Sequence, residues 1–286
     1  MVTGASGLLG RAIVTALRAH EPEVRAAVRS ADVADELRAL GAKVTVGRLG
    51  DAERLAEVCG GAHTLIHLVG GPNQVDEHEV DRANHGSVEV AVEAAREARV
   101  RRFVLLSVPG ANEEAEDPFL RAKGRAESVV AGSGLEHVVL RVTHAYGVGG
   151  LWFTAVVHGA LADPPLVLAS GAVAPVAADD IAAVVAAADD RVEPLVGTFG
   201  LEGPDALGGE ELLELLAGSG VVGTLARPDD TDRLSSLLGI PVSATAAAWI
   251  CSEARADAPD AAEALGVRRT PLAEGLRRTL ARASGR

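Results

Sequence analysis

The sequence predicts an α/β fold built on a doubly wound parallel sheet, with a smaller C-terminal substrate lobe interleaved with it. Short apolar segments alternate with helical patterns through the first half of the chain, and a glycine-rich turn, TGASGLLG, joins the first segment to the first helix. Strands that are apolar on both faces belong to parallel sheets covered by helices. Right-handed crossovers make such a sheet doubly wound.

The elements of this fold follow one another in a regular order. After a first strand that ends at Val2, branched apolar runs predict strands at residues 24–28, 44–46, 64–68, 103–106, 138–140, 173–176 and 198–201. Apolar side chains at helical spacing predict helices at residues 8–20, 33–40, 52–58, 75–98, 118–130, 208–218 and 244–264. A further helix is expected to begin at Asp179 and Asp180, because acidic residues favour the first turn.

The alternation changes beyond Arg141. Residues 145–172 are rich in glycine, proline and small apolar side chains, so we expect them to form a substrate lid. The predicted organisation has a nucleotide-binding domain at residues 1–144, to which residues 173–202 return. The substrate lobe and lid then comprise residues 145–172 and 203–286.

Composition narrows the function classes. A chain of 286 residues that is 48% apolar can bury a large core, and its net charge of −13 argues against nucleic acid or an anionic membrane as partner. Its two cysteines lack CxxC spacing, so we expect no metal site and no disulfide framework. With no export signal and no membrane-spanning run, we expect a cytoplasmic monomer or homodimer that binds a small molecule.

The glycine-rich turn has the features of a phosphate-binding site. Gly4 permits a tight turn from strand to helix, Gly7 lets a pyrophosphate approach the backbone, and Gly10 allows close packing of the helix. The N-terminus of the following helix offers free N–H groups and a positive dipole end. Strand, turn and helix in this order strengthen a signal that would be weak alone.

The residues after the next two strands bear on which nucleotide binds. Arg29 follows the second strand where an acidic residue would accept hydrogen bonds from a ribose, so it favours a 2′-phosphate and hence NADP. Arg11 is a second candidate phosphate partner, and a solvated loop arginine is the alternative for Arg29. Asp51 either accepts a hydrogen bond from the adenine amine or caps the next helix.

A set of motifs together gives the chain a family resemblance. These are TGASGLLG, Leu68-Val69-Gly70, Asn84, Ser107, Lys123 within FLRAK, Leu140-Arg141, VAADDIA at 176–182 and GPDAL at 203–207. Over about residues 1–218 the chain resembles the short-chain dehydrogenase/reductase superfamily, and most closely its atypical, NmrA-like branch. Within that branch it is similar to ketoreductases that tailor angucyclinone polyketides of the simocyclinone type.

The resemblance implies a Rossmann fold that binds NADPH or NADP+. It implies catalytic roles for Ser107 and Lys123, of which Lys123 also holds the nicotinamide ribose; a surface lysine is the alternative. The expected cofactor-binding residues are Gly4, Ser6, Gly7, Leu8, Leu9, Gly10, Arg29, Asp51, Leu68, Val69, Gly70 and Lys123.

One departure from the family pattern matters for the chemistry. The family's proton donor is the Tyr of YxxxK, and here that position is Phe119, which has no donor. The single tyrosine of the chain, Tyr146, lies outside that helix. The proton for a carbonyl reduction would then come from a phenol next to the ketone on the substrate, from water, from Ser107 or from a histidine.

Three hypotheses fit this pattern. The preferred one is an NADPH-dependent ketoreductase that reduces a polycyclic aromatic ketone, as in antibiotic biosynthesis. The alternatives are a non-catalytic NADP(H)-binding redox sensor of the NmrA type, and a nonredox lyase or isomerase on the same fold.

The expected substrate contacts are mostly in and near the lid. They are Asn84, Thr143, Tyr146, Trp152 and Phe153. Trp152 and Phe153 either offer the substrate a flat apolar surface or belong to the core of the small lobe. Among the histidines, His67 is expected in the core, while His85, His144 and His158 either reach the cleft or pack.

Overall fold

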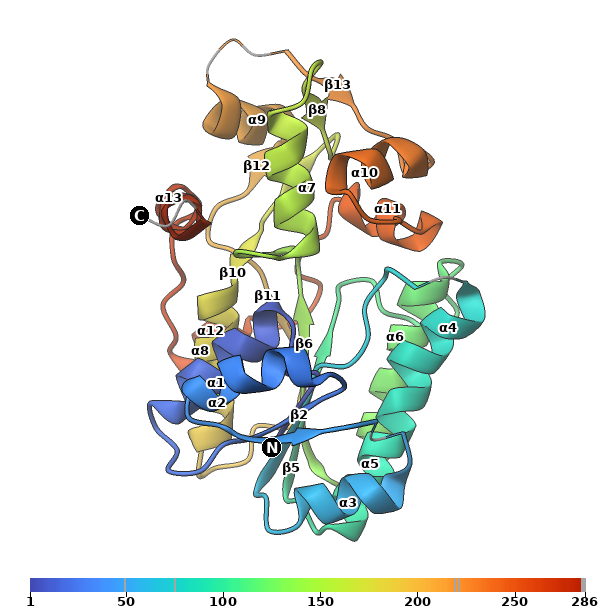
Figure 1. The fold of residues 1–286 in the computed structure, drawn as a ribbon, viewed down its shortest axis with the longest axis vertical. Coiled ribbons are helices and arrows are strands. Elements are labelled where there is room, and N and C mark those ends of the chain that lie inside the picture. The colour runs from blue at the N-terminus through green and yellow to red at the C-terminus, as the bar shows by residue number, and fades with distance from the viewer. Residues whose placement is uncertain (49, 75, 219, 221, 284–286) are drawn as a thin grey trace.

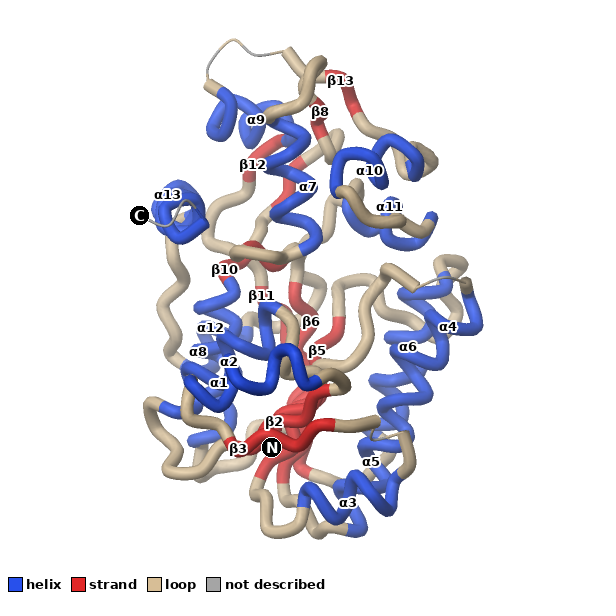
Figure 2. Tube along the Cα trace, viewed as in Figure 1, coloured by secondary structure: helices blue, strands red, loops and turns tan. Residues whose placement is uncertain are grey.

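A parallel sheet of seven strands forms the centre of the molecule (Figures 1 and 2). The computed structural model describes residues 1–48, 50–74, 76–218, 220 and 222–283. The strand order is β11-β6-β5-β4-β1-β2-β3, and all neighbours run parallel. The strands are β1 (Val2–Thr3), β2 (Arg25–Val28), β3 (Lys43–Val46), β4 (Thr64–His67), β5 (Arg102–Ser107), β6 (Glu136–Val142) and β11 (Gly197–Leu201).

Helices cover both faces of this sheet, which confirms the doubly wound fold. One face carries α1 (Leu8–Arg18), α2 (Ala34–Ala39), α8 (Ala178–Asp190) and α12 (Ala261–Leu265). The other carries α3 (Ala52–Cys59), α4 (Glu77–Asp81), α5 (Ser87–Glu97) and α6 (Pro118–Ala131). The strand order reverses between β1 and β4, and in such sheets ligands bind at the carboxyl ends of the strands beside this reversal.

A smaller lobe stands over the carboxyl ends of the strands (Figure 1). Its helices are α7 (Leu151–Ala160), α9 (Gly209–Ala217), α10 (Thr231–Leu238), α11 (Ala244–Ile250) and α13 (Leu272–Ala283). Its strand pairs are β8 (Leu166–Val167) with β13 (Thr224–Leu225) and β9 (Ala172–Val173) with β12 (Leu207–Gly208). A further pair, β7 (Ala145–Tyr146) with β10 (Val176–Ala177), leads from the sheet into this lobe, which has a hydrophobic core of its own.

Several local predictions for the second half of the chain were wrong. The expected helix at 244–264 is two helices, α11 and α12, separated by an irregular segment that contains Pro259. The expected strand at 173–176 is divided between β9 and β10, because Pro175 between them has no N–H to donate. The glycine- and proline-rich stretch 145–172, for which no helix was predicted, contains the helix α7.

The long helix expected at 75–98 is interrupted rather than continuous. It comprises α4, a π-helical turn at Arg82–Gly86, and α5, while residue 75 lies outside the described residues. Single π turns inside helices often occur at functional sites. Among the residues that the structure describes, no helix has both the length and the apolar character needed to cross a bilayer.

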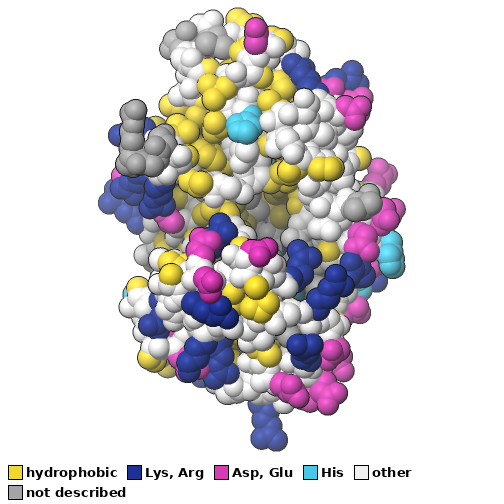
Figure 3. Space-filling model, in the orientation of Figure 1, with side chains coloured by type: hydrophobic (Ala, Val, Ile, Leu, Met, Phe, Trp, Pro, Cys, Tyr) yellow, Lys and Arg dark blue, Asp and Glu magenta, His cyan; other side chains and the backbone are white. Residues whose placement is uncertain are grey.

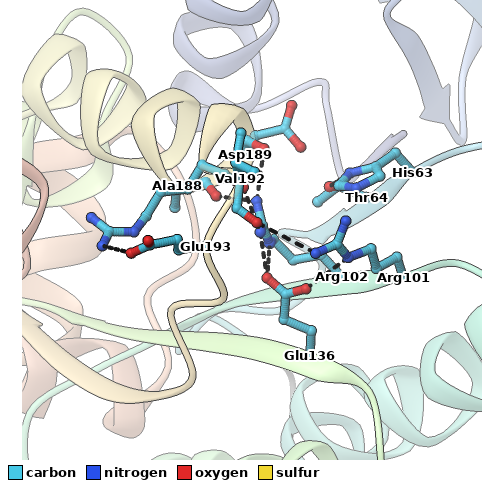
Figure 4. A network of polar contacts seen from close by, with 10 residues as sticks. His63, Thr64, Arg101, Arg102, Glu136, Ala188, Asp189, Val192 and Glu193 are labelled. Carbon is cyan, nitrogen blue, oxygen red and sulfur yellow. Dashed lines mark hydrogen bonds and ion pairs between the residues drawn. The ribbon is translucent and has the colours of Figure 1, made fainter.

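A buried arginine joins the sheet to α8 at the end opposite the small lobe (Figure 4). Arg102, on β5, has no exposed surface and donates Nε–H to Glu136 of β6 at 2.7 Å. Its remaining N–H groups bond the backbone carbonyls of Ala188, Asp189 and Arg191. These carbonyls belong to the C-terminus of α8, where the helix itself leaves them without partners.

We predict that Arg102→Leu lowers the free energy of unfolding by about 3–5 kcal/mol, because it removes the buried partner of the Glu136 carboxylate and of three carbonyls at the end of α8. Arg101→Leu is the matched control, since the Arg101 side chain is 53% exposed although it pairs with the same carboxylate. That control is expected to cost about 1 kcal/mol or less. Urea unfolding measures both, and equal losses would contradict the prediction.

Candidate active site

The turn after β1 is shaped by close backbone contacts. Gly4 has φ +72°, and a Cβ there would lie 2.8 Å from the backbone carbon of Leu68 at the end of β4. At Gly10 a Cβ would lie 2.4 Å from the Cα of Ala5, so the first turn of α1 packs directly on the loop. Both positions therefore require glycine, for the reasons that the sequence suggested.

The N-terminus of α1 is open. Gly7 is its N-cap residue, no side chain caps the helix, and a Cβ at Gly7 would meet no atom within 4 Å. Ser6 beside it is exposed. The free N–H groups of the first helical turn therefore face space that an anionic group can occupy.

The two leucines that follow are not free side chains. Leu8 packs where Gly147 and Gly150 approach it, since a Cβ at either glycine would lie within 3 Å of its methyl groups. Leu9 packs against the core between the sheet and α1. Only the backbone of Leu8 and Leu9 is therefore available to a phosphate.

Three polar residues surround the adenosine side of this turn. Arg29 directly follows β2, is exposed, and forms no hydrogen bond or ion pair with any residue that the structure describes. Arg11 instead pairs with Glu36 of α2 at 3.1 Å. Asp51 caps α3, since its Oδ1 accepts from the Arg54 N–H at 2.8 Å, so the capping interpretation is confirmed.

The loop after β4 is held in place by Asn84. Gly70 and Gly71 have φ +120° and +146°, and the Asn84 side chain accepts from Gly71 N–H at 2.8 Å. Its amide donates to the carbonyls of Gly71 and Val80, at 3.0 and 2.9 Å. Because Asn84 has no exposed surface and these bonds occupy its amide, the prediction that it contacts substrate was wrong.

Ser107 and Lys123 lie together at the end of β5. The Ser107 hydroxyl is buried and has no hydrogen-bond partner among the described residues. Lys123 donates Nζ–H to the carbonyl of Leu106 at 3.0 Å. Burial lowers the pKa of Lys123 to about 8, against a smaller raising effect of Glu127. Two adjacent polar groups with unused hydrogen-bonding capacity therefore stand at this strand end.

An aromatic pair occupies the position of the family tyrosine. The Phe119 ring is buried, its centroid is 5.9 Å from Lys123 Nζ, and it meets the edge of Trp249 at 5.7 Å. Trp249 comes from α11 in the small lobe and was not predicted as a site residue. The only sequence signal is a tryptophan in the alanine-rich run Ala246 to Ile250.

The remaining predicted substrate contacts lie elsewhere. Thr143 is buried and donates its hydroxyl to the Ala174 carbonyl at 2.7 Å. Trp152 and Phe153 lie on α7 within the core of the small lobe, so the core alternative holds for these two aromatics, while the lid role of residues 145–172 stays a prediction. Tyr146 is buried against Gly275 of α13, where burial and Asp180 raise its pKa.

The predicted core role of His67 is confirmed. Its Nδ1 bonds Thr3 and its Nε2 bonds Ser87, and burial lowers its pKa to about 3. His85 is buried and lies between Asp81 and Glu89, one helical turn away on either side.

The other two histidines pack inside or beside the small lobe. His144 stacks on Trp152 and donates Nε2–H to the Ser252 carbonyl at 2.9 Å, and burial lowers its pKa to about 4. His158 bonds the Leu237 carbonyl. His144 is therefore neutral near pH 7.

A cavity of about 520 Å³ adjoins the strand end. It lies between the β5–α6 loop and the segment that follows α11, and the molecule is visibly hollowed between its two parts (Figure 3). The lining residues are Pro109, Gly110, Asp117, Phe119, Leu120, Thr245, Ala248, Trp249, Ser252, Glu253, Ala254, Arg255 and Asp257. Tyr146 lines a different cavity, of about 530 Å³, next to α1 and α13.

Arg141 on β6 holds the walls of the first cavity together. It pairs with Glu127 of α6 at 2.8 Å and with Asp257 at 3.0 Å, and it donates to the carbonyl of Ala111. Asp257 also accepts from the N–H of Gly110 at 2.8 Å. The guanidinium of Arg141 thus joins the sheet to α6, to the β5–α6 loop and to the segment around Asp257.

These residues fit a nicotinamide dinucleotide. The open N-terminus of α1 suits its pyrophosphate, the unpaired Arg29 suits an adenosine phosphate, and Ser107 with Lys123 stand where the opposite end of the molecule would lie. The uncapped helix and the unpartnered Ser107 hydroxyl are the observations that support this fit.

Comparison with known proteins agrees with this geometry. A family model described as NAD(P)H-binding matches residues 4–188. A ketoreductase from Stigmatella aurantiaca that acts on 4-hydroxy-2-methyl-3-oxo-4-farnesyl-3,4-dihydroquinoline-1-oxide is 34% identical over 166 residues, 51% of this chain and 50% of that protein. A ceramide reductase from Caulobacter vibrioides is 32% identical over 148 residues, 52% of this chain and 46% of that protein. The chain thus spans about half the length of the curated relatives it matches.

Solved structures share the fold over nearly the whole chain. A triphenylmethane reductase from Citrobacter sp. complexed with NADP(H) has a TM-score of 0.77 at 23% identity, covering 97% of this chain and 98% of that one. An NADPH-dependent quinone oxidoreductase from Escherichia coli, complexed with NADPH, has a TM-score of 0.77 at 20% identity, covering 98% and 99%. At these identities the likeness establishes the fold.

We predict that Lys123 makes stability rise with pH above its own pKa. Its pKa is about 8 in the folded chain and 10.5 in the unfolded one, so the folded state loses the proton first. Between about pH 8 and pH 10.5 the Lys123 amine is neutral in the folded chain and takes up a proton when the chain unfolds. Because the unfolded state binds more protons in this range, the free energy of unfolding increases with pH.

Lys123→Met is expected to abolish this rise, on the order of 1–3 kcal/mol. The control is Lys43→Met at the only other lysine, whose side chain is 71% exposed. Urea unfolding of the three proteins from pH 7 to pH 10 measures the difference. Parallel curves for the parent and Lys123→Met would contradict the assignment.

Proposed function

The chain belongs to the NAD(P)H-binding family, in its atypical short-chain dehydrogenase/reductase branch, and we propose that it is an NADPH-dependent ketoreductase. One observation carries the proposal. The cofactor turn is intact, and Ser107 and Lys123 stand together at the strand end, where a carbonyl and the nicotinamide would meet. A protein that only binds the nucleotide would need the intact turn but not the pair formed by Ser107 and Lys123.

The chemistry divides between the cofactor and the chain. NADPH, when bound, supplies the hydride. The Ser107 hydroxyl has no internal partner, so it is available to donate to the carbonyl oxygen and orient the ketone. Lys123, held by the Leu106 carbonyl, is available to bind a ribose hydroxyl beside it.

The proton has to come from outside the family's usual residue. Phe119 has no donor, and Tyr146 lies in a different cavity with a raised pKa. We propose that the substrate carries a phenol beside its ketone, or that water supplies the proton. An internal hydrogen bond from such a phenol activates the carbonyl oxygen before hydride arrives.

Polycyclic aromatic ketones, such as those of angucyclinone antibiotics, carry this grouping. The support from relatives is coarser. The Stigmatella aurantiaca relative is a ketoreductase of a fused-ring dihydroquinoline, and the Escherichia coli structural neighbour is a quinone oxidoreductase. The aromatic pair formed by Phe119 and Trp249 suits a flat substrate of this kind.

A second candidate is a redox sensor that binds NADP(H) without turnover. The observation that favours it is the replacement of a proton donor by Phe119 in a tightly packed aromatic contact. The two functions separate experimentally. Purified protein that oxidises NADPH with a panel of polycyclic aryl ketones is a reductase, whereas tight binding with no turnover across the panel favours the sensor.

We predict that Arg29→Ala weakens NADPH binding by about 10- to 100-fold and leaves NADH binding within about twofold. The exposed guanidinium is unpaired and is expected to contact the 2′-phosphate, which NADH lacks. Titration calorimetry with both nucleotides measures the ratio. Arg38→Ala on α2, where the arginine pairs with Asp35, is the control; an unchanged ratio in Arg29→Ala would remove Arg29 from the site.

We predict that Phe119→Tyr does not raise turnover by more than about threefold, far less than the 10²- to 10⁴-fold that a positioned general acid contributes. The added hydroxyl would stand in the aromatic contact with Trp249 and crowd it. Steady-state rates of NADPH oxidation with a peri-hydroxy aryl ketone measure the effect. A large gain would show that the chain is an ordinary reductase lacking its donor.

A further inference from the structure

For the cavity between the β5–α6 loop and α11, whose wall begins two residues beyond Ser107, we propose that it binds the ring system of an uncharged, flat, fused-ring acceptor and rejects anionic ones. Trp249 is the stacking residue in this proposal, and the carboxylates of Asp117 and Glu253 exclude negative charge. The inference rests on the proposed function, because it names the substrate class of that same site.

The location of the cavity links it to the reacting groups. Its wall starts at Pro109 and Gly110, directly after the β5 end that carries Ser107. Phe119 forms part of the wall, and its ring centroid is 5.9 Å from Lys123 Nζ. The buried Phe119 ring thus stands between Lys123 and this cavity, and in the proposal the ligand extends from the end of β5 past this ring.

The volume and lining suit a rigid aromatic body. About 520 Å³ lies within the 300–1,000 Å³ that small-molecule sites occupy. Trp249 is partly exposed and fixed by two edge contacts, with Phe119 at 5.7 Å and with His144 at 4.9 Å. A tryptophan held by such contacts offers a ring at low entropic cost, and Leu120 and Ala248 add apolar wall.

The charges around the cavity are unbalanced. Arg255 pairs with Glu202 through two hydrogen bonds, at 3.0 and 3.1 Å, so its positive charge is already compensated. Asp257 is likewise compensated by Arg141.

Two carboxylates of the lining are left over. Asp117 accepts from the N–H groups of Phe119 and Leu120, and Glu253 accepts from the Ser170 hydroxyl. Neither has a cationic partner among the described residues, and a bound anion would meet both.

The first test uses direct binding without cofactor. The matched probes are 1-hydroxyanthraquinone, which is uncharged, and anthraquinone-2-sulfonate, which has the same ring system and a fixed negative charge. Titration calorimetry is expected to show the uncharged probe binding at least about tenfold more tightly. Equal affinities, or tighter binding of the sulfonate, would overturn the proposal.

Two pairs of variants locate the effect. Trp249→Ala is expected to weaken the uncharged probe by more than about tenfold, and Trp249→Phe by less than about threefold, because phenylalanine keeps an aromatic face. Thermal unfolding of both variants checks that they fold, and Trp249→Phe keeps the test valid if Trp249→Ala does not. Unchanged affinity in a folded Trp249→Ala would exclude the stacking role.

Asp117→Asn and Glu253→Gln keep each side-chain acceptor and remove its charge. In the double variant we expect the affinity for the uncharged probe to be unchanged and to exceed that for the sulfonate by about threefold or less. An undiminished preference would exclude these carboxylates. Binding of the probe in this way, with no NADPH oxidation across the panel of aryl ketones, would count against the ketoreductase and keep the cavity assignment. Reduction of those ketones at a rate that does not depend on Trp249 would keep the ketoreductase and exclude the cavity assignment.

Discussion

The backbone contact between Gly4 and the end of β4 is the constraint on which the rest of the site depends. A side chain at Gly4 would collide with Leu68 and Val69, so the turn after β1 and the loop after β4 can approach only through glycine. This approach places the open N-terminus of α1 beside the point where the strand order reverses. Asn84 then fixes the loop after β4 through its two bonds to the backbone of Gly71, while a third bond, to Val80, ties the same amide to α4.

The small lobe is joined to this frame by polar contacts and by aromatic rings. Arg141 draws Glu127, Asp257 and the Ala111 carbonyl together, so the sheet and the segment after α11 share one charged centre. Phe119 and Trp249 meet across the same boundary. A tyrosine at position 119 would place a hydroxyl in this apolar contact, which gives a physical reason for the phenyl ring beyond the loss of a proton donor.

The sequence predicted the first half of the molecule well because the signals there are local. A glycine with positive φ, a helix cap such as Asp51 and the apolar strands around β4 depend on near neighbours or on a repeated pattern. The second half was predicted less well. The helix α7 and the break between α11 and α12 depend on burial and on contacts with distant segments.

By itself the sequence determined the doubly wound fold, the phosphate-binding turn and the absence of a tyrosine in α6, since each follows from residue type and order. Only the tertiary structure decided which polar groups are free. Asn84 and Thr143 are bonded to the backbone, whereas the hydroxyls of Ser107 and Tyr146 have no hydrogen-bond partner within the part of the chain that the structure describes. The Tyr146 hydroxyl is turned toward α13, so Ser107 is the unpartnered group at the end of β5. It also brought Trp249 to Phe119, 130 positions away along the chain. Hydrogen-bond partners and ring contacts over such separations are set by packing, and no local pattern in the sequence encodes them.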